Sequence, residues 1–423
     1  MSLEWNSWIG EPEEKEVAAE IPEKITLENF PPPAQDEAMN PPPAPPEVVP
    51  LIDPILEQYA EDHPENVSYD YIEKIQRNII HKSQMKAYME TAFEGELNKY
   101  AERQTISTGY DNLDGYIGGL VPGLYVLGAG SGVGKTTFCL QMADYIASSG
   151  HEVVYFAMEQ NQLELASKSI SRLAAQISHV KTEDNSNIIT SMKVRQRAIP
   201  EGSKAIYEQA KKIYMEEIAP RLDIVHGDFR TGTTKIIEFI EEYKRTKQYE
   251  GTAARPVIFI DYLQVLEPPE ETPKNADRRK QIDDIMFALK NYSEEVPIFV
   301  ISSLNRSNYT ARIDYEAFKE SGNIEYTGEV IFGLQMKCIN EDSAFDSATE
   351  SKAGEKRKKI AAEMEKEPRE VELVCLKNRY GKRFGNKRRA CFKYYPSCDL
   401  FEVDYEHYTP HMKNHTGGGK PKL

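Results

Sequence analysis

Cysteine is scarce in this sequence, and its arrangement excludes two common kinds of cross-link. The 423-residue chain has five cysteines, and no two of them form a C-x-x-C pair. An odd number without close pairs argues against a zinc ribbon and against a disulfide framework. We therefore expect a protein of a reducing compartment.

Long apolar runs are missing as well. No segment of the sequence approaches the length of a membrane span, no secretory leader is present, and we find no internal repeat. These absences argue against membrane and secreted proteins. We expect a cytoplasmic protein without a membrane partner.

The chain also lacks the excess of basic residues that is typical of nucleic-acid-binding proteins. Its formal net charge is -16, but residues 1–66 hold sixteen acidic residues, two lysines and thirteen of the 25 prolines. Subtracting these from the totals of 68 acidic and 52 basic residues leaves 52 and 50 in the remainder. Such a composition predicts a disordered, acidic, proline-rich arm. A solvated leader is the simpler interpretation, and an arm that docks a partner or screens a binding site is the alternative.

The remaining pattern predicts one α/β domain behind a short helical linker. Residues 67–104 have apolar positions at helical spacing. In residues 105–410, the apolar runs LYVLG, EVVYFAM, LDIVHG, PVIFIDYLQVL and PIFVISS alternate with helical stretches, which indicates a mostly parallel sheet with helices on both faces. We expect loops at 267–281 and 340–370, the second with an exposed helix, and a flexible tail at 411–423.

A glycine-rich turn in LYVLGAGSGVGKTTFCL lies between an apolar strand and a helix, as in a P-loop. Ala129 replaces the first glycine of G-x-x-x-x-G-K-[ST], and the rest of the motif is intact. Glycines let backbone N–H groups wrap phosphates, the lysine reaches the β- and γ-phosphates, and the threonine ligates Mg²⁺. The predicted nucleotide-binding residues are Gly130, Ser131, Gly132, Val133, Gly134, Lys135, Thr136 and Thr137.

Two carboxylates end other predicted strands. Asp261 follows VIFI and would hold the Mg²⁺ shell together with Thr136. Glu159 ends the predicted strand VVYFAME and would position the attacking water at the same edge of the sheet. Each alone is an ordinary strand-end residue, as a turn former or a helix-start charge, and the P-loop gives both of them a functional interpretation.

The order of six motifs resembles the C-terminal motor domain of DnaB-type replicative helicases, especially the helicase portion of phage and mobile-element primase-helicases. The motifs are STGYDNLDGYIGGL, FAMEQNQLELASKSISRL, IDYLQVL, SSLNRSNY, FKESGNIEYTGEVIFGLQ and LKNRYG, and they cover roughly residues 105–405. Alanine at the first P-loop glycine is also common in that family. The resemblance implies a RecA-like fold, ATP and Mg²⁺, a hexameric ring, and movement on single-stranded DNA from 5′ to 3′.

The resemblance also implies roles for individual residues. Glu159 matches the glutamate that activates water, and Gln264 matches the polar residue that follows the magnesium aspartate. A loop with Lys319, Glu320 and Gly322 matches the one that grips single-stranded DNA phosphates inside the ring.

Lys377 and Arg379 match the lysine and the arginine finger that each subunit inserts into its neighbour's ATP site. Lys377 lies 242 residues beyond Lys135, so the sequence leaves open whether it acts within one subunit or between two. The basic residues that follow, among them Lys382 and Arg383, are expected to be exposed.

Two departures from the family limit these implications. Ser303 stands where many members have a glutamine that senses the γ-phosphate, so either water bridges the gap or Asn305 takes that role. Nothing in residues 1–104 resembles a helical collar or a primase domain, which leaves a primase or a loader as a candidate partner only. A recombination or annealing ATPase that does not unwind DNA, and an ATP-gated adaptor, remain as alternatives.

Overall fold

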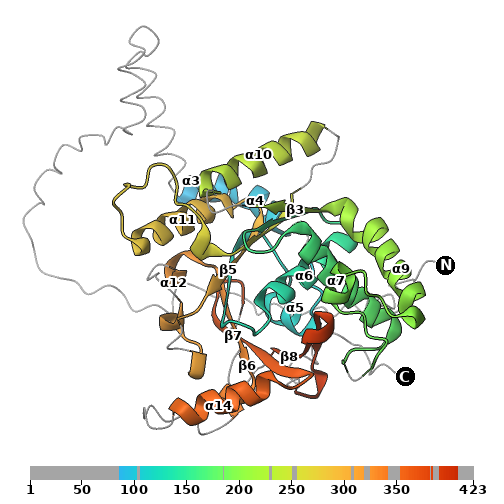
Figure 1. Ribbon diagram of the computed structural model, residues 1–423. Coiled ribbons are helices and arrows are strands. Elements are labelled where there is room, and N and C mark those ends of the chain that lie inside the picture. Colours follow the sequence, from blue (N-terminus) through green and yellow to red (C-terminus); the bar gives the residue numbers. More distant parts are fainter. Residues whose placement is uncertain are drawn as a thin grey trace, which may run out of the picture. The chain divides into compact units, whose positions relative to one another are not determined.

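Figure 1 shows the computed structural model of the chain. The described residues are 85–101, 105–183, 185–227, 231–249, 255–305, 309–318, 324–341, 353–381, 383 and 390–407. The predicted acidic arm (1–66) and tail (411–423) lie outside them. The three residues of the predicted DNA loop, Lys319, Glu320 and Gly322, also lie outside them.

The chain divides by its contacts into residues 1–93 and 94–423. Two helices, α3 (Met85–Thr91) and α4 (Phe93–Ala101), lie inside the segment 67–104 that was predicted to be helical. No helix in the described parts of the chain is both long and apolar enough to cross a membrane.

A nine-stranded sheet organises the second unit (Figure 1). The strands are β1 (Gly123–Ala129), β2 (Val153–Ala157), β3 (Leu222–His226), β4 (Val257–Asp261), β5 (Pro297–Ser303), β6 (Val330–Met336), β7 (Arg369–Asn378), β8 (Ala390–Tyr395) and β9 (Leu400–Val403). Their order is β3-β2-β4-β5-β1-β6-β7-β8-β9. The first six are parallel and the last three continue the sheet antiparallel. The predicted fold class is confirmed, since β1 to β5 coincide with the five apolar runs.

The central strands are buried on both faces, as a parallel sheet covered by helices requires. All seven residues of β1 are buried. Tyr125 and Leu127 belong to one apolar cluster, and Leu124 and Val126 belong to the other. Alternate side chains of β1 therefore pack on opposite faces of the sheet. The continuous apolar run in the sequence follows directly from this double burial.

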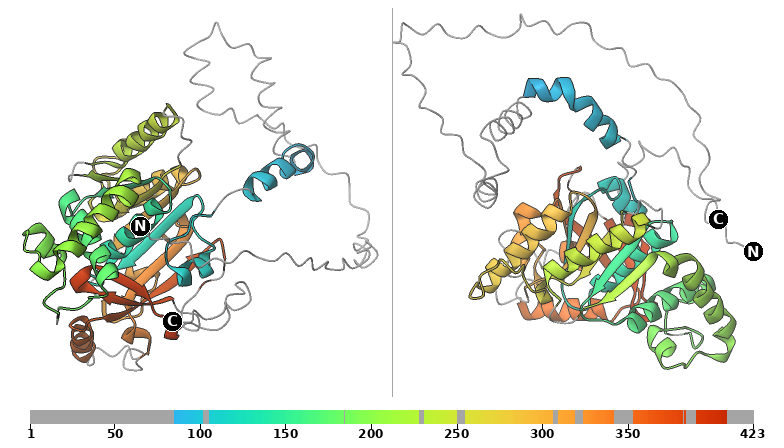
Figure 2. Two further views of the ribbon diagram at one scale, coloured as in Figure 1. Left: turned by 90° about the vertical axis from the view of Figure 1, so that its right-hand side faces the viewer. Right: turned by 90° about the horizontal axis from the view of Figure 1, so that it is seen from above.

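Helices cover the two faces in separate layers (Figures 1 and 2). The helices are α5 (Asp111–Ile117), α6 (Lys135–Ser148), α7 (Gln162–Ser178), α8 (Ser191–Arg195), α9 (Lys204–Ile213), α10 (Thr233–Tyr249), α11 (Arg278–Tyr292), α12 (Ile324–Thr327), α13 (Cys338–Glu341) and α14 (Ala353–Met364). Short turns are η2 (Glu201–Ser203), η3 (Tyr214–Ile218), η4 (Ala219–Arg221), η5 (Leu263–Val265), η7 (Tyr315–Ala317), η10 (Pro396–Cys398) and η11 (Tyr405–His407). Buried side chains of α5, α6, α7 and α9 join the first cluster, and those of α10 and α11 join the second.

The antiparallel extension packs against the start of α6. The rings of Tyr394 and Phe401 stack with centroids 4.3 Å apart, and Phe401 meets Phe138 edge to face at 5.3 Å. The hairpin β8–β9 thereby buttresses the helix that follows the glycine-rich turn.

One predicted loop is shorter than expected. Residues 267–281 were predicted to be a loop, but α11 begins at Arg278, so the run DRRK starts a helix. Asp277 caps this helix by accepting a hydrogen bond from the Lys280 N–H at 2.8 Å. The polar first turn hid the apolar spacing of Ile282, Ile285, Met286 and Leu289, which are all buried. The exposed helix expected within 340–370 is α14.

The buried ion pair between Arg172 and Asp144 offers a test of the packing between α7 and α6. The two side chains are 3% and 5% exposed. Because Asp144→Ala leaves a buried guanidinium without its partner, we expect the free energy of unfolding in urea to fall by about 3–5 kcal/mol. The exposed pair of Arg245 with Glu242 is the control, where Glu242→Ala should cost less than about 1 kcal/mol. Equal losses in the two variants would contradict this account.

Candidate functional site

The glycine-rich turn connects the carboxyl end of β1 to the amino end of α6. Gly134 caps the helix at φ 101°, and no side chain accepts a hydrogen bond at this cap. The first N–H groups of the helix therefore remain available to an anion, and the helix dipole favours negative charge there. A Cβ atom on Gly134 would lie 2.8 Å from the Phe401 ring, so the hairpin behind the turn also demands glycine.

The two threonines after Lys135 have different surroundings. Lys135 and Thr136 are partly exposed on the first turn of α6. Thr137 is buried, and its hydroxyl lies 3.4 Å from Oδ1 of Asp399, which also binds the Lys168 ammonium at 2.5 Å. The structure thus directs the side chain of Thr137 toward the β8–β9 turn.

Asp261 ends β4 with a carboxylate that is almost completely buried. Its residue is 4% exposed, and Oδ2 accepts a hydrogen bond from the Tyr155 hydroxyl at 3.2 Å. Oδ1 finds no hydrogen-bond donor within the described residues. Burial raises the pKa of Asp261, while the Thr136 hydroxyl and the Lys135 ammonium act in the opposite direction. An unsatisfied buried carboxylate oxygen beside a threonine hydroxyl and a lysine has the chemistry of a Mg²⁺–phosphate site.

This donor set fits Mg²⁺ better than a metal held by protein alone. The described residues contain no group of three or more His, Cys, Asp or Glu that could hold a metal ion. Mg²⁺ usually takes one or two carboxylates and completes its shell with water and substrate phosphates. Thr136 and Asp261 supply what such a shell needs from the protein.

Glu159 lies at the same edge of the sheet as Asp261. It is exposed, two residues beyond the end of β2, and the Met158 N–H donates to the Asp261 carbonyl at 2.8 Å. Its charge contributes to raising the pKa of Asp261, after the larger effect of burial. An exposed carboxylate beside a buried one can hold a water molecule near a bound phosphate.

Gln264 connects the ends of β4 and β5. Its amide nitrogen donates to the Ser302 hydroxyl at 2.8 Å, and its oxygen accepts from the Ser303 N–H at 2.9 Å. Ser303 pairs with Ala129, the last residue of β1. Gln264, three residues beyond Asp261, therefore bonds directly to Ser303, the position where many family members have the sensor glutamine.

Asn305 extends this connection away from the glycine-rich turn, residues 129–136, which we call the phosphate cradle. Its N–H donates to the Ala317 carbonyl at 2.8 Å, and its side-chain nitrogen donates to the Glu316 carbonyl at 3.1 Å. Leu304 forms an isolated antiparallel bridge with Phe318. Phe318 is the residue immediately before Lys319 in the sequence, so the described part of the chain ties β5 to the segment that leads into the predicted DNA loop.

Lys377 and Arg379 lie at the opposite edge of the sheet. The Arg379 N–H donates to the Glu329 carbonyl at 3.0 Å, and the Glu329 N–H donates to the Leu124 carbonyl at 2.9 Å, near the start of β1. From Leu124 to Gly130 the chain runs six residues of extended strand, about 20 Å. An arginine side chain cannot span that length, so Arg379 is out of reach of the cradle of its own chain.

Lys377 is bound to the backbone of α12. Its ammonium donates to the carbonyls of Glu325 at 2.6 Å and Tyr326 at 3.3 Å. Burial lowers the pKa of Lys377, and the neighbouring Arg379 acts in the same direction. Arg379 itself is 53% exposed at its side chain. Of the two cations, Arg379 is the one that points into solvent.

The sequence profile described as DnaB-like helicase C terminal domain matches residues 105–388. The chain belongs to this family. Among curated relatives, the replicative DNA helicase DnaB of Helicobacter pylori strain J99 is 25% identical over 299 residues, which cover 65% of this chain and 56% of the relative. DnaB of Geobacillus stearothermophilus is 25% identical over 260 residues, covering 58% and 50%. The chain thus spans about half the length of these relatives.

Solved structures of related proteins share the fold. One solved ATPase domain superposes with a TM-score of 0.56 at 19% identity, and the match covers 75% of this chain and 98% of that one. A DnaB-like replicative helicase described with its interactions with primase gives the same TM-score, 0.56, at 18% identity, with 82% and 74% covered. These likenesses support the RecA-like architecture.

Arg369 is a site residue that the sequence did not reveal in this DnaB-like domain. Its guanidinium donates to the Gly132 carbonyl at 3.0 Å and lies over the Tyr394 ring at 5.8 Å. Nε of Arg369 is buried and finds no partner within the described residues. In the sequence it is one cation within the charged run EKEPRE, so only the three-dimensional contact distinguishes it.

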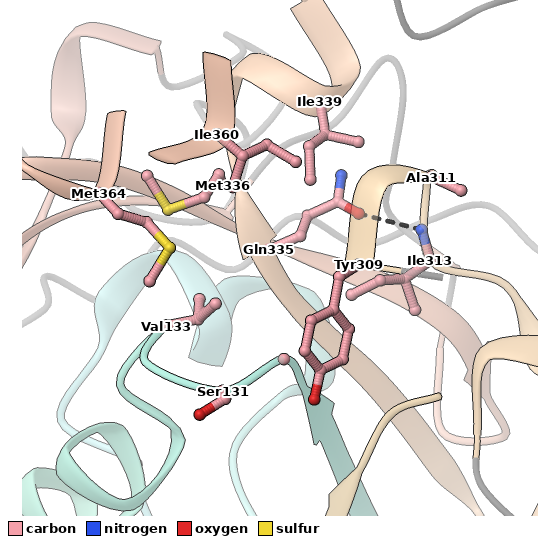
Figure 3. Close-up of a pocket in the computed structure, with 11 residues that line it drawn as sticks. Ser131, Val133, Tyr309, Ala311, Ile313, Gln335, Met336, Ile339, Ile360 and Met364 are labelled. Atoms are coloured by element: carbon pink, nitrogen blue, oxygen red, sulfur yellow. Dashed lines mark hydrogen bonds between the residues drawn. The ribbon is translucent and has the colours of Figure 1, made fainter. Parts of the chain in front are cut away.

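A small, largely apolar pocket with a volume of about 50 Å³ adjoins the same turn (Figure 3). Ile360 and Met364 on α14 face it, so this exposed helix covers one side of the glycine-rich turn. Among the residues that line the pocket is the polar Gln335, whose side-chain oxygen accepts a hydrogen bond from the Ile313 N–H at 3.0 Å. The lining residues are Gly130, Ser131, Val133, Tyr309, Ala311, Ile313, Gln335, Met336, Ile339, Ile360 and Met364.

Two glycines that flank α6 provide a matched test of the cradle. Gly134 and Gly150 both have positive φ, 101° and 94°, but a Cβ on Gly150 would meet nothing within 4 Å. We expect Gly134→Ala to weaken nucleotide binding by at least about tenfold, or about 1.4 kcal/mol. Gly150→Ala should cost about 1 kcal/mol of stability and leave nucleotide affinity unchanged. Fluorescent-nucleotide titration measures the difference, and equal affinities in the two variants would contradict the assignment.

The buried carboxylate of Asp261 is expected to lower the stability of the metal-free protein and to provide a ligand for Mg²⁺. Its raised pKa means that the native state holds this proton more readily than the unfolded state, so stability falls as the pH rises through the folded pKa. Without metal or nucleotide, Asp261→Asn should therefore unfold at a higher urea concentration than the wild type at neutral pH. It should also lose the stabilisation that Mg²⁺ and ATP confer together.

The exposed strand residue Asp223 gives the control for this substitution. Asp223→Asn should change neither the urea midpoint nor the stabilisation by Mg²⁺ and ATP, because that side chain lies at the surface. A metal-free Asp261→Asn protein that is less stable than the wild type at neutral pH would contradict the stated cost of burial. Retained stabilisation by Mg²⁺ and ATP would contradict the metal role.

Proposed function

We propose that the chain is the ATP-driven motor of a ring-forming DNA helicase that moves on single-stranded DNA. The observation that carries this proposal is the division of the site between two edges of one sheet. The P-loop, Asp261 and Glu159 lie at the carboxyl edge of the parallel strands, and Arg379 lies at the amino edge. One copy therefore holds two half-sites that cannot meet within the same chain.

ATP and Mg²⁺ belong at the carboxyl edge. The N–H groups of residues 130–134 and the ammonium of Lys135 bind the phosphates, and Thr136 and Asp261 would hold Mg²⁺. The metal supplies neutralisation of the charge that develops on the phosphoryl oxygens. Glu159 orients the attacking water and accepts its proton, since it is the exposed carboxylate at this edge.

A second copy completes the site. A guanidinium presented to the γ-phosphoryl group stabilises the charge of the transition state. Because the P-loop and Arg379 lie on opposite edges, the contact between copies is head to tail, and such contacts close into a ring when the rotation permits. The family resemblance supplies the expectation of six copies, and Lys377 accompanies Arg379 at the same interface.

The connection to DNA runs through Gln264 and Asn305. A change at the phosphate edge reaches Ser303 through the Gln264 amide and reaches residues 316–318 through Asn305. The loop with Lys319, Glu320 and Gly322 follows directly and binds DNA backbone phosphates, which gives sequence-tolerant and salt-sensitive affinity. Movement from 5′ to 3′ rests on the family resemblance.

The resemblance also bears on cellular context. We place the protein in the cytoplasm, in the replication of a phage, a plasmid or a mobile element, because its motif order is similar to that of primase-helicases of such elements. A primase or a loader is the candidate partner. The related helicase described with its interactions with primase provides the precedent for a primase.

The action of Arg379 at the neighbouring copy's site is tested with two variants that are defective for different reasons. Arg379→Ala should bind nucleotide normally but lose roughly a thousandfold or more in DNA-stimulated ATP hydrolysis. Glu159→Ala should be inactive while keeping its finger. When the two are mixed and reassembled at equal amounts, about a quarter of the interfaces join an intact site to an intact finger, and hydrolysis should return in proportion.

Arg383 is the matched control, because it is exposed and follows Arg379 by four residues. Arg383→Ala should keep hydrolysis near the wild-type rate. A mixture of Arg379→Ala and Glu159→Ala that is as inactive as either parent would refute action between subunits, and the ring proposal with it.

A further inference from the structure

Glu329 is a buried carboxylate at the amino edge of the sheet, directly before β6. The residue is 5% exposed, although glutamate is almost never fully buried without partners. Its Oε2 accepts a hydrogen bond from the Leu124 N–H at 2.7 Å, at the start of β1. Its Oε1 forms an ion pair with the ammonium of Lys290 from α11. The first of these contacts explains a polar acceptor here, but not a charged one.

The same residue holds Arg379 at two points. The Glu329 carbonyl accepts the Arg379 N–H at 3.0 Å, which fixes the backbone from which the finger projects. The Glu329 carboxylate lies 4.0 Å from Nη1 of Arg379, which is within the range of a charge–charge attraction. The Arg379 side chain as a whole is 53% exposed.

The charges around Glu329 do not balance. Lys290 and Arg379 pair with it, and Lys377 feels the charges of both Glu329 and Glu325, so two carboxylates face three cations. A cluster with surplus positive charge attracts an anion, and the γ-phosphate of a neighbouring copy would supply one. A long flexible arginine that is already restrained loses less conformational freedom when it engages that phosphate.

We propose that Glu329 is a positioning residue that orients Arg379 for the nucleotide site of the neighbouring copy. This inference rests on the proposed function, because it requires the finger to act between copies. Glu329 acts through Arg379 and does not touch the nucleotide. A merely structural role, in which Glu329 only satisfies the N–H of Leu124 and pairs with Lys290, would instead affect the P-loop of its own chain through β1.

The substitution Glu329→Gln separates these two roles. Glutamine keeps an oxygen for the Leu124 N–H but removes the charge that restrains Arg379. With the full-length chain, we expect kcat for DNA-stimulated ATP hydrolysis to fall at least tenfold and nucleotide affinity to change less than twofold. Glu294→Gln is the matched control, since it removes an exposed carboxylate shortly before β5 at the same edge and should change neither quantity.

Mixing assigns the defect to one side of the interface. A Glu329→Gln copy has an intact P-loop, and a Glu159→Ala copy has an intact finger. Reassembly of the two at equal amounts should therefore restore hydrolysis to the same extent as the mixture of Arg379→Ala with Glu159→Ala. If Glu329→Gln does not yield folded protein, Glu329→Asp keeps the charge but withdraws it from the guanidinium, and the same complementation is expected with a smaller loss.

Two results would overturn this inference. One is unchanged hydrolysis in Glu329→Gln. The other is a loss that Glu159→Ala does not complement while the Arg379→Ala mixture does recover, which would place the effect of Glu329 within its own chain. Failure of the Arg379→Ala mixture itself would instead refute the proposed function, so the two failures are distinguishable.

Discussion

The direction of one buried strand sets the working geometry of this domain. β1 delivers the glycine-rich turn at its carboxyl end, and β6 and β7 bring Glu329 and Arg379 beside its amino end. Seven buried residues separate the two ends, and a fully buried strand cannot bend or shorten without breaking both apolar layers. The glycine-rich turn and Arg379 are therefore kept apart by a fully buried strand. Any reaction that needs both requires a second copy.

Rigid support for the cradle comes from elements that are distant in the sequence. Tyr394 and Phe401 of the terminal hairpin pack against Gly134, and Arg369, which lies over the Tyr394 ring, binds the carbonyl of Gly132. Asp399 links the hairpin to Thr137 and Lys168. Preorganised N–H groups bind phosphate without further loss of backbone entropy, so these contacts make the C-terminal strands part of the proposed nucleotide site.

The polar path beyond the cradle gives the absent sensor glutamine a structural context. Ser303 is too short to reach across the site, yet its N–H is held by Gln264, and Asn305 carries the connection on to residues 316–318. We propose that this path of backbone and amide hydrogen bonds takes the place of the one long side chain.

Much of the fold was predictable because apolar runs and a P-loop are local signals. The strand runs placed β1 to β5, and the carboxyl-edge rule brought Asp261 and Glu159 together at one edge. Other features depend on the whole topology. The start of α11 was missed because a polar first turn masked its period. Arg369 and Glu329 carry no sequence pattern, and the separation of Arg379 from the cradle follows only from the antiparallel register of β7 on β6.

The central claim is that each nucleotide site is completed by two copies of the chain. The most direct test is the ATPase rate per protomer, measured with single-stranded DNA across a dilution series in which assembly is followed by mass. The account predicts that the rate per protomer falls in parallel with the assembled fraction and vanishes for the monomer. A monomer that hydrolyses ATP at the same rate per protomer as the assembly would contradict it.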